Sequence, residues 1–388
     1  MHERMQWYVD EQIIPCCACA VLRGTDIVDH RTFGYMDLDS REPLRLDAIF
    51  RMFSNTKPIT SVAAMMLWEE ARFALDDPLG SILPAFADMW VLKPDAESAA
   101  DVERAATPIT MRQLMSHSSG LSYSFLEPDS LIDQLYVGAR LGLGPINGLT
   151  LAQASDRLAS LPLAFHPGTS WRYSYATDVL ARCVEVLAGQ PFDVFLRERI
   201  FEPLDMVDTG YVVPAAKLDR LITEYAPANV MRPMGGGLVR ADEPGNSFFA
   251  KPRKLLGGGT GLVSTVSDYM SFLRMIINGG RWNGAQLLQA DTVRLLHTNQ
   301  LPDGVGVQFP FWRMRNNVFG LGFAIKQAPA RGEPDSAIDE YHWGGMGGTH
   351  TWIAPRAGIA GMCMTQLQPG FWHHFSHDFK RMAYERYG

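Results

Sequence analysis

The stretch SNTKPITSVAAMML, residues 54–67, joins a polar start to a run of apolar residues of helical length. Ser54 and Lys57 are three residues apart, so on an α-helix their side chains lie on one face and can share a hydrogen bond. From Ile59 to Leu67 the run is almost entirely apolar, which is typical of a helix that is buried all round. The sequence therefore predicts a central helix that holds Ser54 and Lys57 rigidly at its beginning.

Ser54 and Lys57 together could carry out nucleophilic catalysis. A serine hydroxyl is a poor nucleophile at neutral pH and needs a base beside it. Lys57 is a candidate for that base, and the N–H groups at a helix N-terminus suit a developing oxyanion. Alone the S-x-x-K pattern is a weak signal, because a Ser that only caps a helix, followed by an exposed Lys, has the same sequence.

A second element is Tyr173, in the aromatic and turn-rich stretch 165–175 that leads into another predicted helix. Near Lys57 its phenol would lose a proton more easily, because a neighbouring positive charge favours the charged form. Tyr173 could then take the Ser54 proton and return it to a leaving group. The alternative is an ordinary packing role.

A third element is Trp343-Gly344-Gly345-Met346, at the end of a predicted strand. Paired glycines in strands often mark the close approach of a ligand or of another backbone. The N–H of Met346 could join that of Ser54 in a two-donor oxyanion hole. The alternative is a glycine bulge beside a packed Trp.

The order of the predicted elements indicates an α+β fold. Two strands around a turn are expected at 16–36, and strands return at 317–326, 338–343, 349–354 and 359–365. Two T-x-x-Q capping boxes, which begin at Thr110 and Thr150, start helices in the middle of the chain. We therefore predict an antiparallel sheet flanked by helices from residues 1–76 and 251–388, and a mostly helical inserted domain with a connector at 77–250. The site is expected between them.

Composition excludes several classes of partner. The 388 residues carry a net charge of −7 without a basic stripe, which argues against nucleic acid or an anionic membrane. No leader and no long apolar span is seen, so we expect a cytoplasmic protein. The five cysteines are expected to be small buried residues in a reduced compartment, and a zinc site is poorly supported. No metal or other cofactor is expected, and oligomeric state is not readable.

Other local patterns point to no further chemistry. There is no G-x-S-x-G elbow and no H-E-x-x-H motif. His373 and His377 are one helical turn apart, but without a carboxylate partner a packing role is favoured over a metal site. His117 is expected to be a hydrogen-bonded structural residue. The glycine-rich segment 257–261 lacks the Lys-Ser/Thr pair of a phosphate loop, and we expect it to pass close beneath the site.

Taken together, the three ordered motifs Ser54-x-x-Lys57, Tyr173-Ser174-Tyr175 and Trp343-Gly344-Gly345 resemble those of the serine β-lactamase and penicillin-binding-protein superfamily. The chain looks most similar to its class C branch, and there to the family VIII carboxylesterases. The resemblance runs from about residue 12 to 385. It implies Ser54 as the acylated nucleophile, Lys57 and Tyr173 as the coupled base and acid, and the amides of Ser54 and Met346 as the oxyanion hole.

Two departures from the β-lactamase pattern concern recognition. Trp343 replaces the Lys of the K-T-G motif, which can attract a substrate carboxylate. Tyr175 replaces the Asn that usually ends the second motif. Both changes favour less polar esters, and Tyr123, Phe125 and Trp352 are candidates to extend the aromatic surface, with core packing as the alternative.

The resemblance implies a serine carboxylesterase that hydrolyses small to medium acyl esters through an acyl-enzyme on Ser54. Three alternatives stay open. A transacylase would use the same first half-reaction. A weak β-lactamase or D-peptide hydrolase is disfavoured by Trp343 and Tyr175. A non-catalytic binding module is disfavoured by the intact Ser54, Lys57 and Tyr173.

Overall fold

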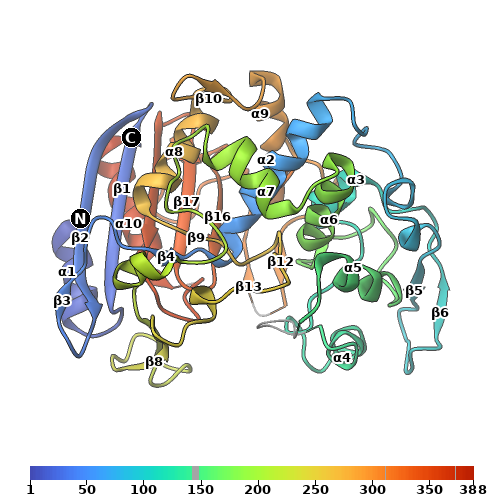
Figure 1. Ribbon diagram of the computed structural model, residues 1–388, viewed down its shortest axis with the longest axis horizontal. Helices are drawn as coiled ribbons and strands as arrows, with labels where there is room; N and C mark the ends of the chain where they lie inside the picture. Colours follow the sequence, from blue (N-terminus) through green and yellow to red (C-terminus); the bar gives the residue numbers. More distant parts are fainter. Residues whose placement is uncertain (142–147, 311, 372) are drawn as a thin grey trace.

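The computed structural model describes residues 1–141, 148–310, 312–371 and 373–388. Its centre is an eight-stranded antiparallel sheet in the order β14-β15-β16-β17-β18-β1-β2-β3 (Figure 1). The strands are β1 (Cys16–Arg23), β2 (Asp26–Asp37), β3 (Glu42–Pro43), β14 (Asn317–Phe319), β15 (Ala324–Lys326), β16 (Tyr341–Gly345), β17 (Thr349–Ala354) and β18 (Ile359–Met364). Because β1 pairs with β18, segments from both ends of the chain meet inside the sheet, as predicted.

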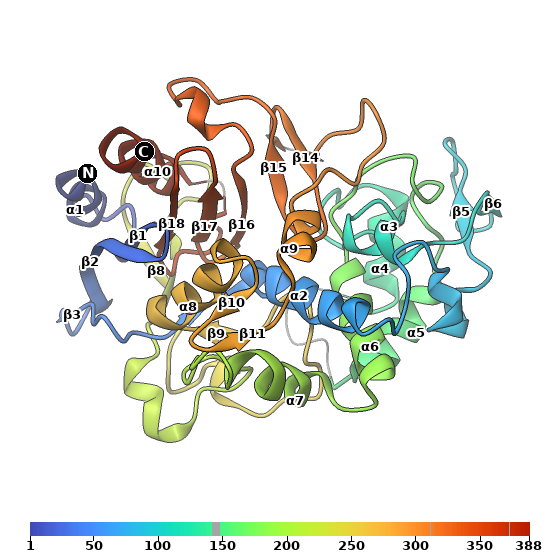
Figure 2. The same cartoon turned by 90° about the horizontal axis from the view of Figure 1, so that it is seen from above.

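Helices cover both faces of this sheet (Figure 2). On one side lie α1 (His2–Asp10) and α10 (His374–Tyr387), and on the other α2 (Thr56–Glu69) and α8 (Val266–Ile277). Successive side chains of a strand point to opposite faces, so the strands supply two cores. Cys17, Cys19 and Cys363 join the core with α1 and α10, whereas Ala18 and Met362 join the core with α2 and α8.

Four further helices lie on the right in Figure 1. They are α3 (Met111–Met115), α4 (Leu131–Gly138), α5 (Leu151–Ala159) and α6 (Ala176–Ala188), beside the hairpin β5 (Trp90–Leu92) and β6 (Val102–Arg104). One of them, α6, packs against α2. Both predicted capping boxes are present, at the starts of α3 and α5. The short elements that complete the described chain are α7 (Phe192–Leu196), α9 (Ala290–Leu296), β4 (Phe50–Arg51), β9 (Val263–Ser264), β10 (Arg281–Trp282), β11 (Ala285–Gln286), β12 (Gln308–Phe309) and β13 (Trp312–Arg313).

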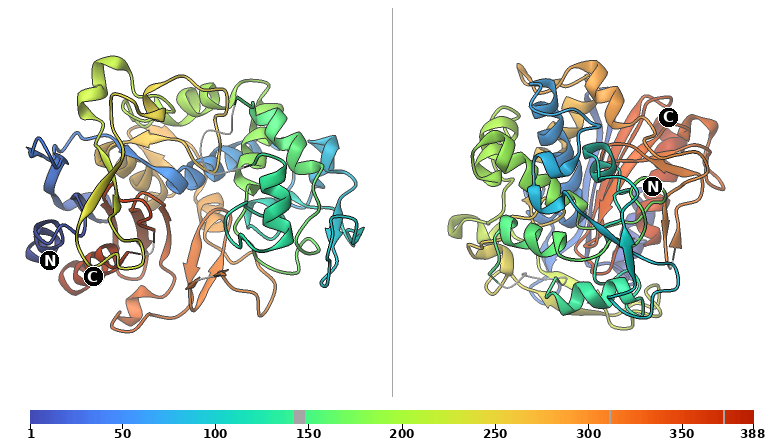
Figure 3. Two further views of the ribbon diagram at one scale, coloured as in Figure 1. Left: turned by 90° about the horizontal axis from the view of Figure 1, so that it is seen from below. Right: turned by 90° about the vertical axis from the view of Figure 1, so that its right-hand side faces the viewer.

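The predicted connector contains the hairpin β7 (Glu224–Pro227) and β8 (Leu238–Asp242). The backbone N–H of Tyr225 donates to the carbonyl of Gln366 at 2.9 Å, so this hairpin is attached to the segment that follows β18. Figure 3 shows it, in yellow and yellow-green, on the side of the molecule that holds the two termini. The division of the chain into a sheet domain and an inserted domain stays a prediction. Every helix among the described residues is too short or too polar to cross a bilayer.

Candidate active site

Ser54 lies in a single 3₁₀ turn, Phe53–Asn55, that leads directly into α2. Phe53 has a φ of +45°, a conformation that is strained for a residue with a side chain and that is often found at functional sites. Strand β16 ends against this turn. A Cβ atom on Gly345 would lie 2.3 Å from the carbonyl oxygen of Met52, so only glycine lets the strand come this close. The expected close approach of backbone at the glycine pair is therefore confirmed.

Lys57 is fully buried in the first turn of α2. Its Nζ atom donates to the carbonyl of Gly259 at 2.6 Å, to the hydroxyl of Tyr123 at 3.0 Å and to Ser54 Oγ at 3.4 Å. Burial lowers the pKa of Lys57 to about 7. The negative charge of Asp178 has the opposite, smaller effect and raises this pKa. A lysine with this pKa is neutral in an appreciable fraction of molecules near pH 7 and can accept the Ser54 proton.

Tyr173 stands beside this pair. Its hydroxyl shares a hydrogen bond with Ser54 and accepts one from the indole Nε1 of Trp343 at 3.4 Å. The Lys57 ammonium lies 4.6 Å from the centre of its ring. The expectation that Lys57 eases loss of the phenolic proton is wrong for this structure, because burial raises the pKa of Tyr173 well above its ordinary value. Tyr173 thus stays protonated and is suited to donate a proton.

Asp178 was not recognised from the sequence. It lies in α6, buried, and its Oδ1 accepts a hydrogen bond from the N–H of Gly259 at 3.1 Å. The carbonyl of the same glycine holds Lys57. A Cβ atom on Gly259 would lie 2.6 Å from Asp178 Oδ2, so the glycine-rich segment does pass close beneath the site. Only tertiary packing brings Asp178 here, and no sequence motif marks it.

Ser54 opens into a cavity of about 300 Å³ whose walls are largely aromatic. Of the predicted residues, Tyr123, Phe125, Tyr173, Tyr175 and Met346 line it together with Ser54. The rings of Tyr123 and Tyr175 meet edge to face, with their centres 4.4 Å apart. The other lining residues are Phe53, Asp178, Glu224, Ala241, Asp242, Phe248, Phe249, Leu255, Gly259, Thr260, Gly261 and Gln368.

The two tryptophans that the sequence placed at the pocket have different positions. Trp343 is 2% exposed and lies behind Tyr173, packed edge to face on Phe319, so it supports the tyrosine from behind. Trp352 is on the opposite face of the sheet and packs on Phe379 of α10. The reason is the register: Trp352 pairs with His342, one residue away from Trp343, and neighbouring residues of a strand face opposite ways. Trp352 is therefore a core residue and not part of the pocket.

The histidines have structural positions. His117 shares a hydrogen bond of 3.1 Å with Ser174 Oγ, and burial lowers its pKa well below the usual value. His373 caps α10 by accepting from the N–H of Phe375. Within the described chain, the pair His373 and His377 belongs to no group of three side chains able to share a metal ion.

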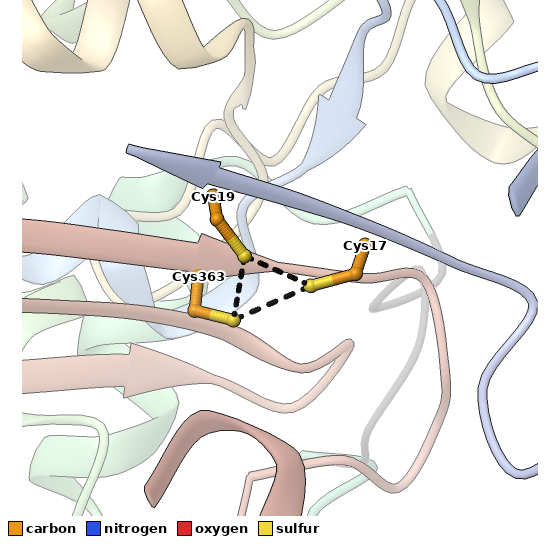
Figure 4. Close-up of side chains that lie close together, drawn as sticks. All are labelled: Cys17, Cys19 and Cys363. Carbon is orange, nitrogen blue, oxygen red and sulfur yellow. Dashed lines mark hydrogen bonds between the residues drawn. The ribbon is translucent and has the colours of Figure 1, made fainter. Parts of the chain in front are cut away.

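Three of the five cysteines form such a group. The sulfur atoms of Cys17, Cys19 and Cys363 lie 3.3 to 3.5 Å from one another, in the core beneath α10 (Figure 4). Burial raises the pKa of the Cys19 and Cys363 thiols, which opposes the thiolate form that metals bind. Burial also acts to raise the pKa of Cys17, but hydrogen bonds from Cys19 and Cys363 outweigh it and lower this pKa to about 6. A structural zinc site also needs a fourth ligand. All five cysteines are free and buried, as expected for small core residues.

A family model described as Beta-lactamase matches residues 2–382. The chain belongs to the beta-lactamase family. Protein Rv1367c of Mycobacterium tuberculosis is 32% identical over 343 residues, which are 87% of this chain and 82% of that protein. Esterase EstB of Burkholderia gladioli is 30% identical over 360 residues, 89% of this chain and 84% of that protein.

Solved structures show the same fold for this beta-lactamase family member. One is that of EstCE1, described as a hydrolase with promiscuous acyltransferase activity. It aligns with a TM-score of 0.83 at 25% identity and covers 100% of this chain and 97% of that one. The α+β fold and the superfamily predicted from the three motifs are confirmed.

Proposed function

We propose that this protein is a serine carboxylesterase that works through an acyl-enzyme on Ser54. The observation that carries the proposal is the buried Lys57, whose Nζ lies 3.4 Å from Ser54 Oγ and whose pKa is lowered to about 7 by burial. The name of the relative EstB as an esterase supports the same reaction class. Within the family we place the chain among the family VIII carboxylesterases. We expect a cytoplasmic location, since free cysteines suit a reduced compartment.

In the first half-reaction Lys57 takes the proton of Ser54, and Ser54 Oγ attacks the ester carbonyl. The amides of Ser54 and Met346 bind the oxyanion. The carbonyl of Met346 accepts a hydrogen bond of 2.7 Å from Gly370, which anchors this residue beside the site. When the ester bond breaks, Tyr173 donates its proton to the leaving alcohol oxygen and Lys57 replaces that proton.

In the second half-reaction water attacks the acyl-enzyme. Lys57, neutral again, takes a proton from the water as the new bond to the carbonyl carbon forms. The bond from the acyl carbon to Ser54 Oγ then breaks, Ser54 regains a proton from Tyr173, Lys57 passes its proton to Tyr173, and the carboxylic acid leaves. A transacylase would follow the same path with an alcohol or amine in place of water. The description of EstCE1 makes that alternative worth testing, by product analysis with an added acceptor alcohol.

The aromatic cavity favours an ester with an apolar acyl or alcohol group. Trp343 stands where β-lactamases have the K-T-G lysine, and it is buried and hydrogen-bonded to Tyr173. A penicillin carboxylate would therefore lack its usual cation at this position. We expect turnover of nitrocefin to be far below that of p-nitrophenyl esters.

The deciding experiment is intact-mass analysis after reaction with a fluorophosphonate. We expect one adduct on the unmodified chain, none on Ser54→Ala, and one on Ser267→Ala, which changes an exposed serine of α8 as a matched control. The Ser54→Ala variant should also lose ester turnover. An adduct or turnover that survives in Ser54→Ala would refute the assignment.

A further inference from the structure

Glu224 is a buried acid in the wall of the cavity that Ser54 faces. It begins β7, is 3% exposed, and lines the cavity together with Ser54. Among the described residues, its Oε1 atom has no hydrogen-bond partner. A buried polar atom without a partner destabilises a fold, and a bound molecule that completes the hydrogen bond is one explanation for its presence.

The neighbouring arginine directs its hydrogen bonds to acceptors other than this carboxyl group. Arg51 is fully buried and gives its Nε and Nη2 atoms to Asp242, at 2.8 and 2.6 Å. Its Nη1 donates to the carbonyl of Ile222 at 2.6 Å and to Gln366 Oε1 at 3.2 Å. Asp242 is also the cross-strand partner of Glu224. Asp242 and Glu224 therefore lie near the one guanidinium group of Arg51. Its N–H groups bond to Asp242, Ile222 and Gln366 rather than to the Glu224 carboxyl group.

The position of Glu224 is fixed relative to the nucleophile. The next residue, Tyr225, forms a parallel bridge with Leu367, and its carbonyl accepts from the N–H of Gln368 at 2.8 Å. The side chain of Gln368 in turn contacts the sulfur of Met346, at 3.6 Å. Glu224 is thus tied through the segment after β18 to the residue proposed to form the oxyanion hole.

Phenylalanine rings and a second acid, Asp242, line the same cavity. Phe53, Phe248 and Phe249 line the cavity with Glu224, and the rings of Phe53 and Phe249 pack edge to face, 6.1 Å apart. An apolar substrate chain would lie among these rings and meet Glu224, whereas the carboxylate of Asp242 already accepts hydrogen bonds from Arg51 and Ser247. Burial raises the pKa of Glu224 to about 7, with Arg51 lowering it and Asp242 raising it.

We propose that Glu224 forms a polar subsite which binds a hydrogen-bond donor, a hydroxyl or an amino group, carried by the substrate away from its ester bond. The preferred substrates are then esters with an apolar body and a donor group at a distance from the carbonyl. This inference rests on the proposed esterase function, and it adds the class of substrate.

The test compares p-nitrophenyl esters from butanoate to octanoate, each with and without a terminal hydroxyl or amino group. For the chain length that reaches Glu224 we expect the donor to raise kcat/KM about tenfold, as a hydrogen bond to a buried acid would. Glu224→Leu should lose this preference, measured as the ratio of kcat/KM for the ester with the donor to kcat/KM for the ester without it. Glu243→Gln, a control just after β8, should keep the preference. Comparing kcat/KM between the hydroxyl esters and the amino esters shows which of the two donors is bound.

A second measurement does not depend on turnover. Calorimetric titration with hexan-1-ol and with 1-methoxypentane, its isomer without a donor, should show tighter binding of the alcohol to the unmodified protein, and equal binding to Glu224→Leu. Glu224→Met, which has a similar length and no side-chain oxygen, serves if the leucine variant does not fold. Equal binding and equal turnover with and without the donor, or a preference that survives in Glu224→Leu, would overturn the subsite. A missing fluorophosphonate adduct would instead count against the esterase.

Discussion

The Nζ atom of Lys57 donates a hydrogen bond to the hydroxyl of Tyr123, 3.0 Å away, in a fully buried setting. The sequence placed Tyr123 only among the residues of an aromatic surface. The structure makes it a direct partner of the proposed base, so it helps to set both the position and the proton affinity of that base.

Replacing Tyr123 by Phe removes this partner and keeps the ring. A hydrogen bond to a charged group contributes about 1.5–3 kcal/mol, so we expect kcat to fall at least tenfold, with a much smaller change in KM. The lost acceptor destabilises the ammonium form, and the pKa of Lys57 should move further down. Steady-state kinetics across pH tests both effects. Unchanged kcat and an unchanged pH profile would show that Tyr123 only packs.

The pH dependence of hydrolysis follows from the lowered pKa of Lys57. Below about pH 7 the amine is protonated and cannot accept the Ser54 proton, so kcat/KM should rise with pH and level off above about pH 7. In Lys57→Arg the side chain stays protonated, and turnover should be lost at every pH. A profile that is flat from pH 5 to 9 would exclude Lys57 as the titrating base.

Gly345→Ala should show whether the position of Ser54 can be disturbed without unfolding the protein. The new Cβ would lie 2.3 Å from the Met52 carbonyl oxygen and 2.4 Å from Thr349 Oγ1, so the turn that carries Ser54 has to move. A displacement of this kind costs about 100-fold in rate. Gly138→Ala is the matched control, because its Cβ would meet no atom within 4 Å. Kinetics and thermal melting of both variants give the comparison, and full activity in Gly345→Ala would contradict the close approach.

A substitution in the cluster of Cys17, Cys19 and Cys363 should lower the stability of the fold and leave ester turnover unchanged. Cys363→Ser places a hydroxyl in an apolar core, and we expect a loss of about 1–3 kcal/mol in the free energy of unfolding. The kcat/KM value should stay the same, since the cluster lies on the face of the sheet turned toward α10. In the folded protein all five buried thiols should resist a thiol reagent. Denaturant unfolding with kinetics tests this, and a loss of turnover without a loss of stability would contradict it.

Local patterns predicted much of the fold because they depend on neighbouring residues. The buried helix that follows Ser54 and the capping boxes at Thr110 and Thr150 are set by spacings of a few residues. The pairing of strands from both chain ends followed from their apolar runs. The motifs likewise pointed to Ser54, Lys57 and Tyr173, which the structure brings together at one cavity.

Other features depend on tertiary packing and could not be predicted. Asp178 and Glu224 reach the cavity from α6 and β7, and neither has a pattern around it that marks a site. The face of the sheet on which Trp352 lies depends on the strand register. A shift of one residue would place its side chain on the opposite face. The raised pKa of Tyr173 depends on how completely it is buried, and the sequence does not give that depth.

The pairing of β1 with β18 has a consequence for biosynthesis. The partner of Cys19 in this ladder is Cys363, so the middle of the sheet cannot close on a ribosome until nearly the whole chain has been made. Until then the early hairpin of β1 and β2 has an open edge, a feature that invites association with other chains. Such distant pairing also slows folding. Nascent chains that stop before residue 359 should therefore aggregate, although they already contain Ser54, Lys57 and Tyr173.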